Sequence, residues 1–124
     1  MRVAKDLVAA SATPMVLGIL ADGESYGYAI LRRINELSGG ELEWTEGLLY
    51  PLLHRLERLG YVKSSWQSVT GERRRKYYRI TNMGLDELDE QRRQWDTVVD
   101  ALKEIWLGPG DPRPFIAIPL EGLA

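Results

Sequence analysis

Residues 45–60 read TEGLLYPLLHRLERLG, a pattern that predicts a helix from about residue 46 to 59. The leucines recur at intervals of three and four residues, which gathers them on one apolar face. Thr45 is a good N-cap, and Gly60 is typical of the residue that closes a helix. Pro51 falls in the second turn, where it removes one backbone hydrogen bond.

A β-hairpin is predicted to follow this helix. Residues 61–66 (YVKSSW) and 73–80 (RRRKYYRI) read as two strands, and residues 67–72 read as a six-residue loop between them. We expect Trp66 to pack the hairpin onto the preceding helix. On the other side of that helix, residues 41–44 (ELEW) alternate in polarity and predict a short edge strand.

Two helical regions are predicted upstream. Apolar spacing indicates helix at about 3–10 and again at about 12–21, with Thr13-Pro14 as the break or as the start of the second helix. Ser25 is expected to cap a further helix, which the Ser-Gly-Gly sequence at residues 38–40 would end.

A last, long helix is predicted over residues 82–107, capped by Thr81. Its seam follows the alternating four and three spacing of a dimerising heptad pattern, at Leu88, Arg92, Trp95, Val99, Leu102 and Trp106. Val98 and Ile105 widen the apolar face. From residue 108 onward the chain holds three glycines and four prolines, so residues 108–124 are not expected to form a regular helix.

The predicted fold class is mainly α with a small β-hairpin: a winged helix-turn-helix followed by a long C-terminal dimerisation helix. We assign residues 1–81 to the winged helix-turn-helix domain, 82–107 to the dimerisation helix and 108–124 to a tail rich in proline and glycine. The N-terminal helix of one copy is also expected to pack on the dimer.

Composition excludes several classes of protein. The chain has 124 residues, no cysteine and a single histidine, His54. Disulfide scaffolds, thiolate metal sites and cysteine nucleophiles are therefore excluded, and no metal site or cofactor is expected. The longest apolar stretches are too short for a membrane span, and no secretory signal is recognisable. We therefore expect a cytoplasmic protein without a membrane partner.

The net charge of −2 conceals a partition along the chain. Residues 1–49 carry a net charge of −3 and residues 80–124 carry −5, whereas residues 50–79 carry +6 from eight bases and two acids. The run Arg73–Lys76 lies in this basic block, and alternate side chains of a strand point to opposite faces. Such a run either protects a hairpin edge from pairing or neutralises phosphates. Its position after a helix-turn-helix favours double-stranded DNA as the partner.

Three blocks of the sequence, taken together, resemble the PadR family of transcriptional regulators: YGY at residues 26–28, LYPLLHRLE at 49–57 and GERRRKYYRIT at 71–81. The resemblance covers about residues 12–107 and is closest to the small members with a single dimerisation helix. It implies a homodimeric winged-helix repressor on an inverted-repeat operator.

The expected DNA-binding residues lie in the recognition helix, the wing and the YGY block: Thr45, Glu46, Leu48, Tyr50, Pro51, His54, Arg55, Gly71, Arg73, Arg74, Arg75, Lys76 and Tyr26. The resemblance places a small or hydroxylated residue where this chain has Leu48, which offers apolar contact instead of a hydrogen bond. We expect Tyr50 to face outward, Tyr26 to contact phosphate and Tyr28 to pack in the core.

Dimerisation is assigned to the helix seam, at Leu88, Trp95, Val98, Val99, Leu102, Ile105 and Trp106. In some PadR-like proteins the dimer helices surround a cavity for planar aromatic compounds, so the resemblance implies a small aromatic effector near Trp95, Val99 and Arg92. Either such an effector releases the operator or the seam serves dimerisation alone.

No catalytic constellation is recognisable, because the sequence lacks a phosphate-binding glycine loop and metal-ligand spacing, and we expect no enzyme activity. The remaining alternative is a winged-helix module that binds other proteins.

Overall fold

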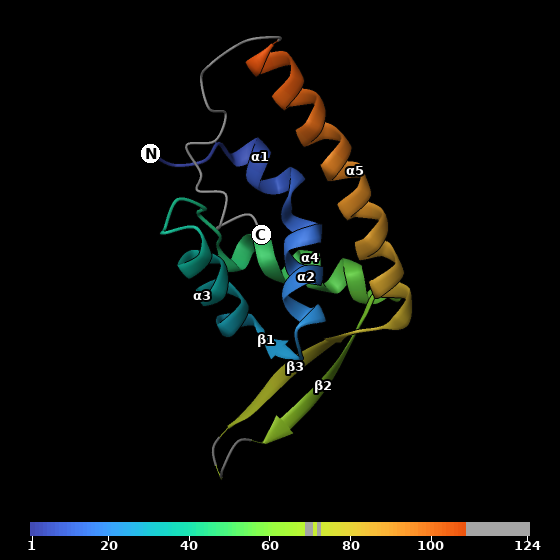
Figure 1. Cartoon of the computed structure of the whole chain (residues 1–124). Helices are drawn as coiled ribbons and strands as arrows, with labels where there is room; N and C mark the ends of the chain where they lie inside the picture. Colours follow the sequence, from blue (N-terminus) through green and yellow to red (C-terminus); the bar gives the residue numbers. More distant parts are fainter. Residues whose placement is uncertain (69–70, 72, 109–124) are drawn as a thin grey trace. The chain divides into compact units, whose positions relative to one another are not determined.

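The computed structural model describes residues 1–68, 71 and 73–108. All but the first residue of the expected tail, residues 109–124, lie outside this described part. Eight elements follow one another in the order α1, α2, β1, α3, α4, β2, β3 and α5 (Figure 1). The chain divides into two compact units, Met1–Asp89 and the residues from Glu90 onward.

The two N-terminal helices are confirmed as α1 (Lys5–Ala10) and α2 (Ala12–Ala21). Ser11 lies between them, and its hydroxyl donates to the carbonyl oxygens of Leu7 and Val8 at 2.8 and 3.2 Å. Pro14 lies in the first turn of α2, where a missing N–H leaves no intrahelical bond unmade.

The prediction that Ser25 caps the next helix is wrong. Ser25 and Tyr26 form the short strand β1 (Ser25–Tyr26), which pairs with Tyr78 and Tyr77 of β3 (Arg74–Ile80). Helix α3 (Gly27–Leu37) therefore begins one residue later than predicted, with Tyr26 at the N-cap in place of Ser25. Backbone pairing in the sheet satisfies this segment in place of a side-chain cap.

The edge strand expected at residues 41–44 is also absent from the described structure. The carbonyl of Glu41 accepts a hydrogen bond from the backbone N–H of Val3 at 3.0 Å, and the N–H of Leu42 donates to the Ser38 hydroxyl at 3.1 Å. This backbone is thus engaged with the N-terminal segment and the end of α3, while β1 occupies the free side of β3.

The predicted recognition helix is confirmed as α4 (Glu46–Arg58), which continues through Pro51. The Thr45 hydroxyl accepts a hydrogen bond from the Leu48 N–H at 3.2 Å, so Thr45 is the N-cap. Gly60 has a φ of 86°, a left-handed conformation that closes helices and favours glycine.

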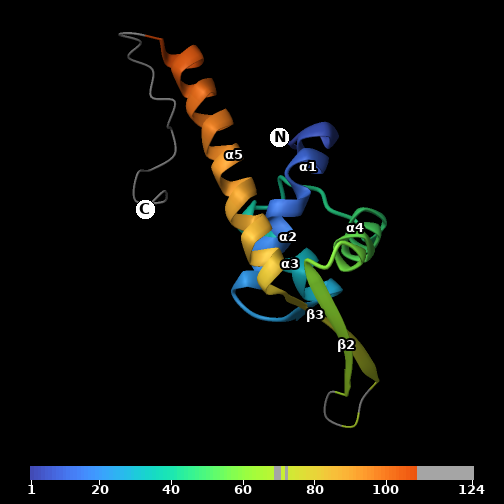
Figure 2. The same ribbon diagram turned by 90° about the vertical axis from the view of Figure 1, so that its right-hand side faces the viewer.

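The β-hairpin is confirmed and is longer than expected. β2 (Val62–Ser68) pairs with β3 in a continuous antiparallel register from Val62 opposite Ile80 to Ser68 opposite Arg74. The connection is therefore residues 69–73 and not 67–72. Figures 1 and 2 show the paired strands reaching away from the helices, and β3 is the central strand of the sheet β1-β3-β2.

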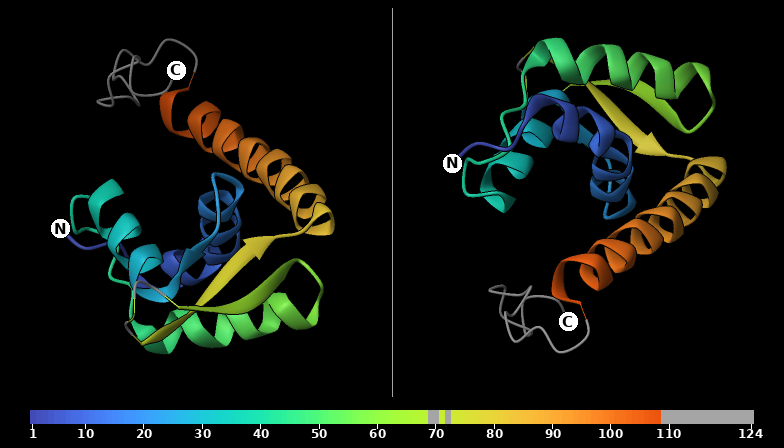
Figure 3. Two further views of the ribbon diagram at one scale, coloured as in Figure 1. Left: turned by 90° about the horizontal axis from the view of Figure 1, so that it is seen from below. Right: turned by 90° about the horizontal axis from the view of Figure 1, so that it is seen from above.

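One apolar core joins the helices of the first unit to the root of the hairpin. Figure 3 shows α4 running alongside the hairpin, and these two elements are in contact. Tyr78 and Val62 supply the side chains of the sheet that are each only 1% exposed. The remaining core is almost entirely aliphatic and is formed by Val16, Leu17, Leu20, Ile30, Ile34, Leu49, Leu52, Leu53, Leu56 and Leu88, with Ala12.

The last helix is confirmed as α5 (Asn82–Leu107), and the Thr81 hydroxyl accepts from the Gly84 N–H at 3.1 Å at its start. Its first turns belong to the first unit, and the helix from Glu90 onward belongs to the second. Within the described ranges, no helix combines the length and the apolar character needed to cross a membrane.

Candidate nucleic-acid interface

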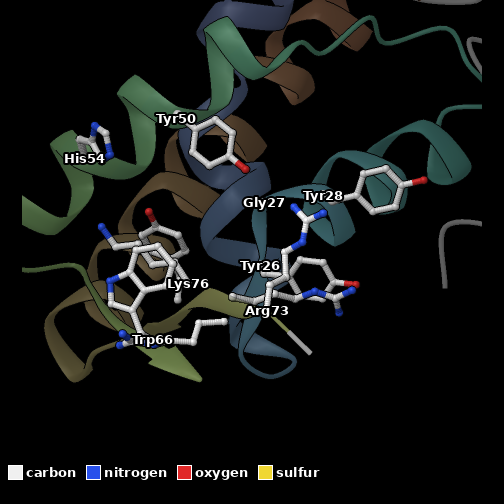
Figure 4. A pocket seen from close by; sticks show the side chains of 11 residues that line it. Tyr26, Gly27, Tyr28, Tyr50, His54, Trp66, Arg73 and Lys76 are labelled. Atoms are coloured by element: carbon white, nitrogen blue, oxygen red, sulfur yellow. The ribbon is translucent and has the colours of Figure 1, made fainter. Parts of the chain in front are cut away.

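A cleft of about 670 Å³ lies between the second and third turns of α4, the junction of β1 with α3, and the hairpin (Figure 4). All of its walls belong to the first unit. Its lining combines four cations with five aromatic side chains, a glycine and the single histidine: Tyr26, Gly27, Tyr28, Tyr50, His54, Trp66, Arg73, Arg74, Arg75, Lys76 and Tyr78. A concave surface of this composition suits an anionic partner with flat or apolar parts.

Tyr50 and His54 form the wall contributed by α4, and they follow one another at a distance of one helical turn. Tyr50 was expected to face outward, and its side chain is half-buried at the wall of the cleft. Its ring lies over Gly27, where an added Cβ would stand 2.2 Å from the tyrosine hydroxyl oxygen. Figure 4 shows that hydroxyl pointing to the start of α3. His54 is exposed at the cleft.

The hairpin contributes the four consecutive cations. The side chains of Arg73, Arg74 and Arg75 are exposed, and Lys76 is half-buried. The Arg74 guanidinium lies 5.4 Å from the ring centroid of Trp66, and the Arg75 guanidinium lies 4.5 Å from that of Tyr26. Cation–π contacts of this kind occur at up to about 6 Å.

The cleft is electropositive because no acidic residue of the described part of the chain forms an ion pair with its cations. The ion pairs found among the described residues join the N-terminus to Glu41, Arg2 to Glu43, and Arg93 to Glu90, and none of them involves the wing. A groove lined by charge of one sign focuses the field on an incoming partner of the opposite sign. Phosphate groups meet this requirement.

A partly buried hydrogen bond ties the recognition helix to the hairpin. The Ser64 hydroxyl on β2 donates to a carboxylate oxygen of Glu57 on α4 at 2.6 Å. Ser64 is the register partner of Tyr78. Burial raises the pKa of the Tyr78 phenol, and the charges of Glu57 and Tyr50 raise this pKa further. The helix and the wing are thus held together at the root of the hairpin.

The cleft brings together seven of the expected DNA-binding residues: Tyr26, Tyr50, His54, Arg73, Arg74, Arg75 and Lys76. The other six lie outside its lining. Thr45, Glu46 and Pro51 are exposed on the first turns of α4, Leu48 is half-buried there, and Gly71 lies at the hairpin tip. The Arg55 guanidinium donates to the Thr13 hydroxyl at 3.4 Å and so is directed to α2.

Sequence reasoning misplaced two aromatic residues of the cleft. Trp66 was expected to pack the hairpin onto α4, but its side chain is 57% exposed, and Tyr28, expected in the core, is 63% exposed. Strand alternation gave no signal for Trp66, because its register partner Lys76 lies on the same face of the sheet as the buried Tyr78. Gly27 and Tyr78 were also missed as cleft residues.

The residues assigned to the dimer seam and the effector lie along α5. Leu88 is 7% exposed and belongs to the core of the first unit, so its role in dimerisation stays a prediction. In the second unit Val98 and Ile105 are 49% and 75% exposed, and Trp106 is 52% exposed. Trp95, Val99 and Leu102 are half-buried, and Arg92 is exposed.

Comparison with known proteins assigns the family. The model of the PadR-like transcriptional regulator family matches residues 16–90, more than half of the chain. The chain belongs to the PadR family of transcriptional regulators. A PadR family regulator from Eggerthella lenta has a similar solved structure, with a TM-score of 0.71 and 32% identity over 87% of this chain and 88% of the other. The resemblance found in the sequence is thereby confirmed.

Two further relatives support the same assignment. A transcriptional regulator from Clostridium thermocellum has a TM-score of 0.75 and 29% identity, covering 82% of this chain and 96% of its own. The transcriptional regulator Rv3488 of Mycobacterium tuberculosis is 40% identical over 78 residues, which are 63% of this chain and 69% of the relative. The winged-helix fold class of a PadR regulator is confirmed. The sheet has one short strand, β1, beyond the predicted hairpin.

Proposed function

We propose that this PadR-family chain is a sequence-specific transcriptional repressor that binds double-stranded DNA as a homodimer on an inverted-repeat operator. The observation that carries the proposal is the cationic cleft beside the N-terminal half of α4, which four consecutive wing cations line without an acidic partner among the described residues. Repression would follow from occlusion of the polymerase in the cytoplasm.

The proposed docking places each surface of the first unit against one feature of the duplex. The N-terminal turns of α4 enter the major groove, where Glu46, Leu48 and Pro51 reach base edges. The wing cations contact the backbone beside that groove and supply affinity that does not depend on sequence. A phosphodiester strand then occupies the cleft between α4 and the hairpin. In the sequence, one acidic block precedes the basic block and another follows it. This partition of charge favours approach of the DNA from a single direction.

Dimerisation is proposed through α5. Val98 and Ile105 expose large apolar surface on one helix, and they widen the apolar face beside the heptad seam inferred from the sequence. An apolar helix face of this kind is buried at low cost by a second copy of itself. Two recognition helices would then lie about one turn of DNA apart, roughly 34 Å.

A small aromatic effector is proposed at the dimer seam, near Trp95, Val99 and Arg92. The half-buried indole of Trp95 offers a stacking surface, and the exposed guanidinium of Arg92 offers a partner for an anionic substituent. Such a compound releases the operator if it binds one arrangement of the two copies more tightly than the other. Quenching of tryptophan fluorescence in the wild type, lost in Trp95→Ala, tests this part by itself.

The test of the main proposal removes the wing charges. Wild-type protein first selects bound fragments from a genomic library, and fluorescence anisotropy then measures affinity for those fragments across a salt series. Arg73→Ala/Arg74→Ala/Arg75→Ala should weaken binding to every fragment. The slope of log affinity against log salt should become shallower by about 2 to 3, because each neutralised phosphate contributes about 0.9 to it.

Lys5→Ala/Arg32→Ala/Arg33→Ala is the matched control, because it removes three exposed cations that lie outside the cleft. This variant should keep most of the affinity and the salt slope. Unchanged binding by the wing variant would refute the interface. Failure of the wild type to select any fragment would favour the alternative, a module that binds protein.

A further inference from the structure

Two aromatic rings flank the central strand of the sheet, and each lies under a different wing arginine. The Arg74 guanidinium lies 5.4 Å from the centroid of the Trp66 ring on β2, and the Arg75 guanidinium lies 4.5 Å from the centroid of the Tyr26 ring on β1. Arg74 and Arg75 are adjacent on β3 and therefore point to opposite faces of the sheet. Each face thus has its own arginine and its own ring.

The register gives both pairs the same diagonal relation. Trp66 is directly opposite Lys76, and Tyr26 is directly opposite Tyr77. Arg74 comes two residues before Lys76, and Arg75 comes two residues before Tyr77. Each arginine is therefore the diagonal neighbour of its ring across the sheet, a separation that long and aromatic side chains can bridge. Because the same offset recurs with strands on both sides of β3, the two contacts follow from the sheet geometry.

Neither of these two aromatic side chains has its main role in the packing of the apolar core. Trp66 is 57% exposed and Tyr26 is half-buried, whereas the buried aromatic residue of the sheet is Tyr78, which is 1% exposed. Tyr26 also contacts Tyr77 edge-on, at 5.3 Å between ring centroids. Because Trp66 remains this exposed on a strand of the wing, it stabilises the fold little. Its contact with an arginine therefore points to a role at the interface.

A guanidinium that stacks by its face keeps its N–H edges available. Those edges form the fork that binds phosphate oxygens in a bidentate manner. No carboxylate forms an ion pair with either arginine in the described part of the chain. Stacking also restricts a long side chain before binding, so that less conformational entropy remains to be lost when phosphate is bound.

We propose that Trp66 and Tyr26 are positioning residues of the wing, which hold the guanidinium groups of Arg74 and Arg75 by their faces and leave their edges ready for backbone phosphates. The proposal rests on the proposed DNA-binding function. It adds Trp66 to the DNA-binding surface, and it gives Tyr26 a role through Arg75 in place of the direct phosphate contact expected from the sequence. It also explains why Trp66 faces the cleft instead of packing against α4.

The test is a double-mutant cycle on the cleaner pair, Trp66 and Arg74. Trp66→Leu should weaken binding of selected DNA fragments about two- to fivefold, the range expected for one exposed cation–π contact. Trp66→Phe keeps a ring and should stay within about twofold of the wild type. In the Arg74→Ala background, Trp66→Leu should cause no further loss, because the residue through which it acts is gone.

Two outcomes would overturn the proposal: full affinity of Trp66→Leu, or a loss that is undiminished in the Arg74→Ala background, which would make Trp66 a direct DNA contact. Urea unfolding of each variant serves as the control for the fold, since an exposed side chain should leave the midpoint nearly unchanged.

A measurement without DNA separates this proposal from the proposed function. In the wild type the indole ring current should shift the Arg74 side-chain Cδ protons upfield in an NMR spectrum, and Trp66→Leu should abolish that shift. A ring-current shift in a protein that selects no DNA would refute the DNA-binding function while leaving the stacking intact. Selection of DNA by a protein without the shift would refute the positioning role.

Discussion

Gly84 on α5 lies directly against the backbone of Tyr61, so that a Cβ added at Gly84 would stand 2.1 Å from the Tyr61 carbonyl oxygen. The same junction holds two hydrogen bonds from Thr81, whose hydroxyl donates to the Gly60 carbonyl at 2.6 Å and whose N–H donates to the Tyr61 carbonyl at 3.0 Å. The first turn of α5 is thereby fixed to the turn that ends the recognition helix.

Gly84→Ala should therefore destabilise the protein, although alanine is normally the better helix former. Because the clash is with backbone, which cannot rotate away, we expect a loss of about 1 to 3 kcal/mol in the free energy of unfolding, the usual range for overpacking. Urea unfolding followed by circular dichroism measures it. Gly18→Ala within α2 is the matched control, since nothing lies within 4 Å of its added Cβ, and it should stabilise by up to about 1 kcal/mol. Equal effects of the two variants would contradict the close approach at Gly84.

Gly27→Ala should act differently, because the atom it meets is the far end of a side chain. Its Cβ would stand 2.2 Å from the Tyr50 hydroxyl oxygen, and Tyr50 can rotate into the open cleft. We expect a smaller loss of stability than for Gly84→Ala, together with a loss of DNA affinity similar to that of Tyr50→Ala. In the Tyr50→Ala background, Gly27→Ala should have little further effect in an anisotropy titration. Additive losses would show that Gly27 matters for another reason.

The sequence was sufficient for the elements whose formation depends on local pattern. The leucine spacing and the Thr45 cap located α4 within one residue at its end, because both signals act within the helix itself. The misassigned segments depend on distant partners. Ser25 lies in a strand only because β3 offers it an edge, and residues 41–44 are held by the N-terminal segment.

In the candidate site, too, the residues marked by a local pattern could be predicted, and those placed by distant contacts could not. The four wing cations could be located from the sequence, because a run of charge is visible without a structure. The exposure of Trp66 and Tyr28 could not be predicted from hydrophobicity, since aromatic residues occur both in cores and at interfaces. Their placement depends on the register of β2 with β3 and on the late start of α3, neither of which is encoded in a local pattern.

Tyr78 should make the stability of the protein fall at alkaline pH. Burial, with Glu57 and Tyr50, raises the pKa of Tyr78 in the folded state. Its contribution to stability is therefore complete below the pKa of the unfolded chain, about 10, and is lost as the pH rises through the folded pKa. Tyr78→Phe retains the buried ring, so its free energy of unfolding should fall less than that of the wild type between about pH 8 and 11. Parallel urea curves at each pH give the difference, and an identical decline in both proteins would exclude Tyr78 as the cause.

Ile105→Glu should separate the proposed dimer into monomers. Ile105 is 75% exposed on α5, and a carboxylate at this seam position would have to be buried against its copy, which is costly without a partner. Light scattering should give about twice the 14.1 kDa chain mass for the wild type and about that mass for the variant. Thr97→Glu is the matched control, because Thr97 is exposed on α5 outside the proposed seam, and it should leave the dimer intact.

A monomeric variant that stays folded should also lose affinity for a two-half-site operator far more than for a single half-site, since only the dimer engages both half-sites together. A wild-type protein that scatters as a monomer would refute the seam and with it the inverted-repeat operator.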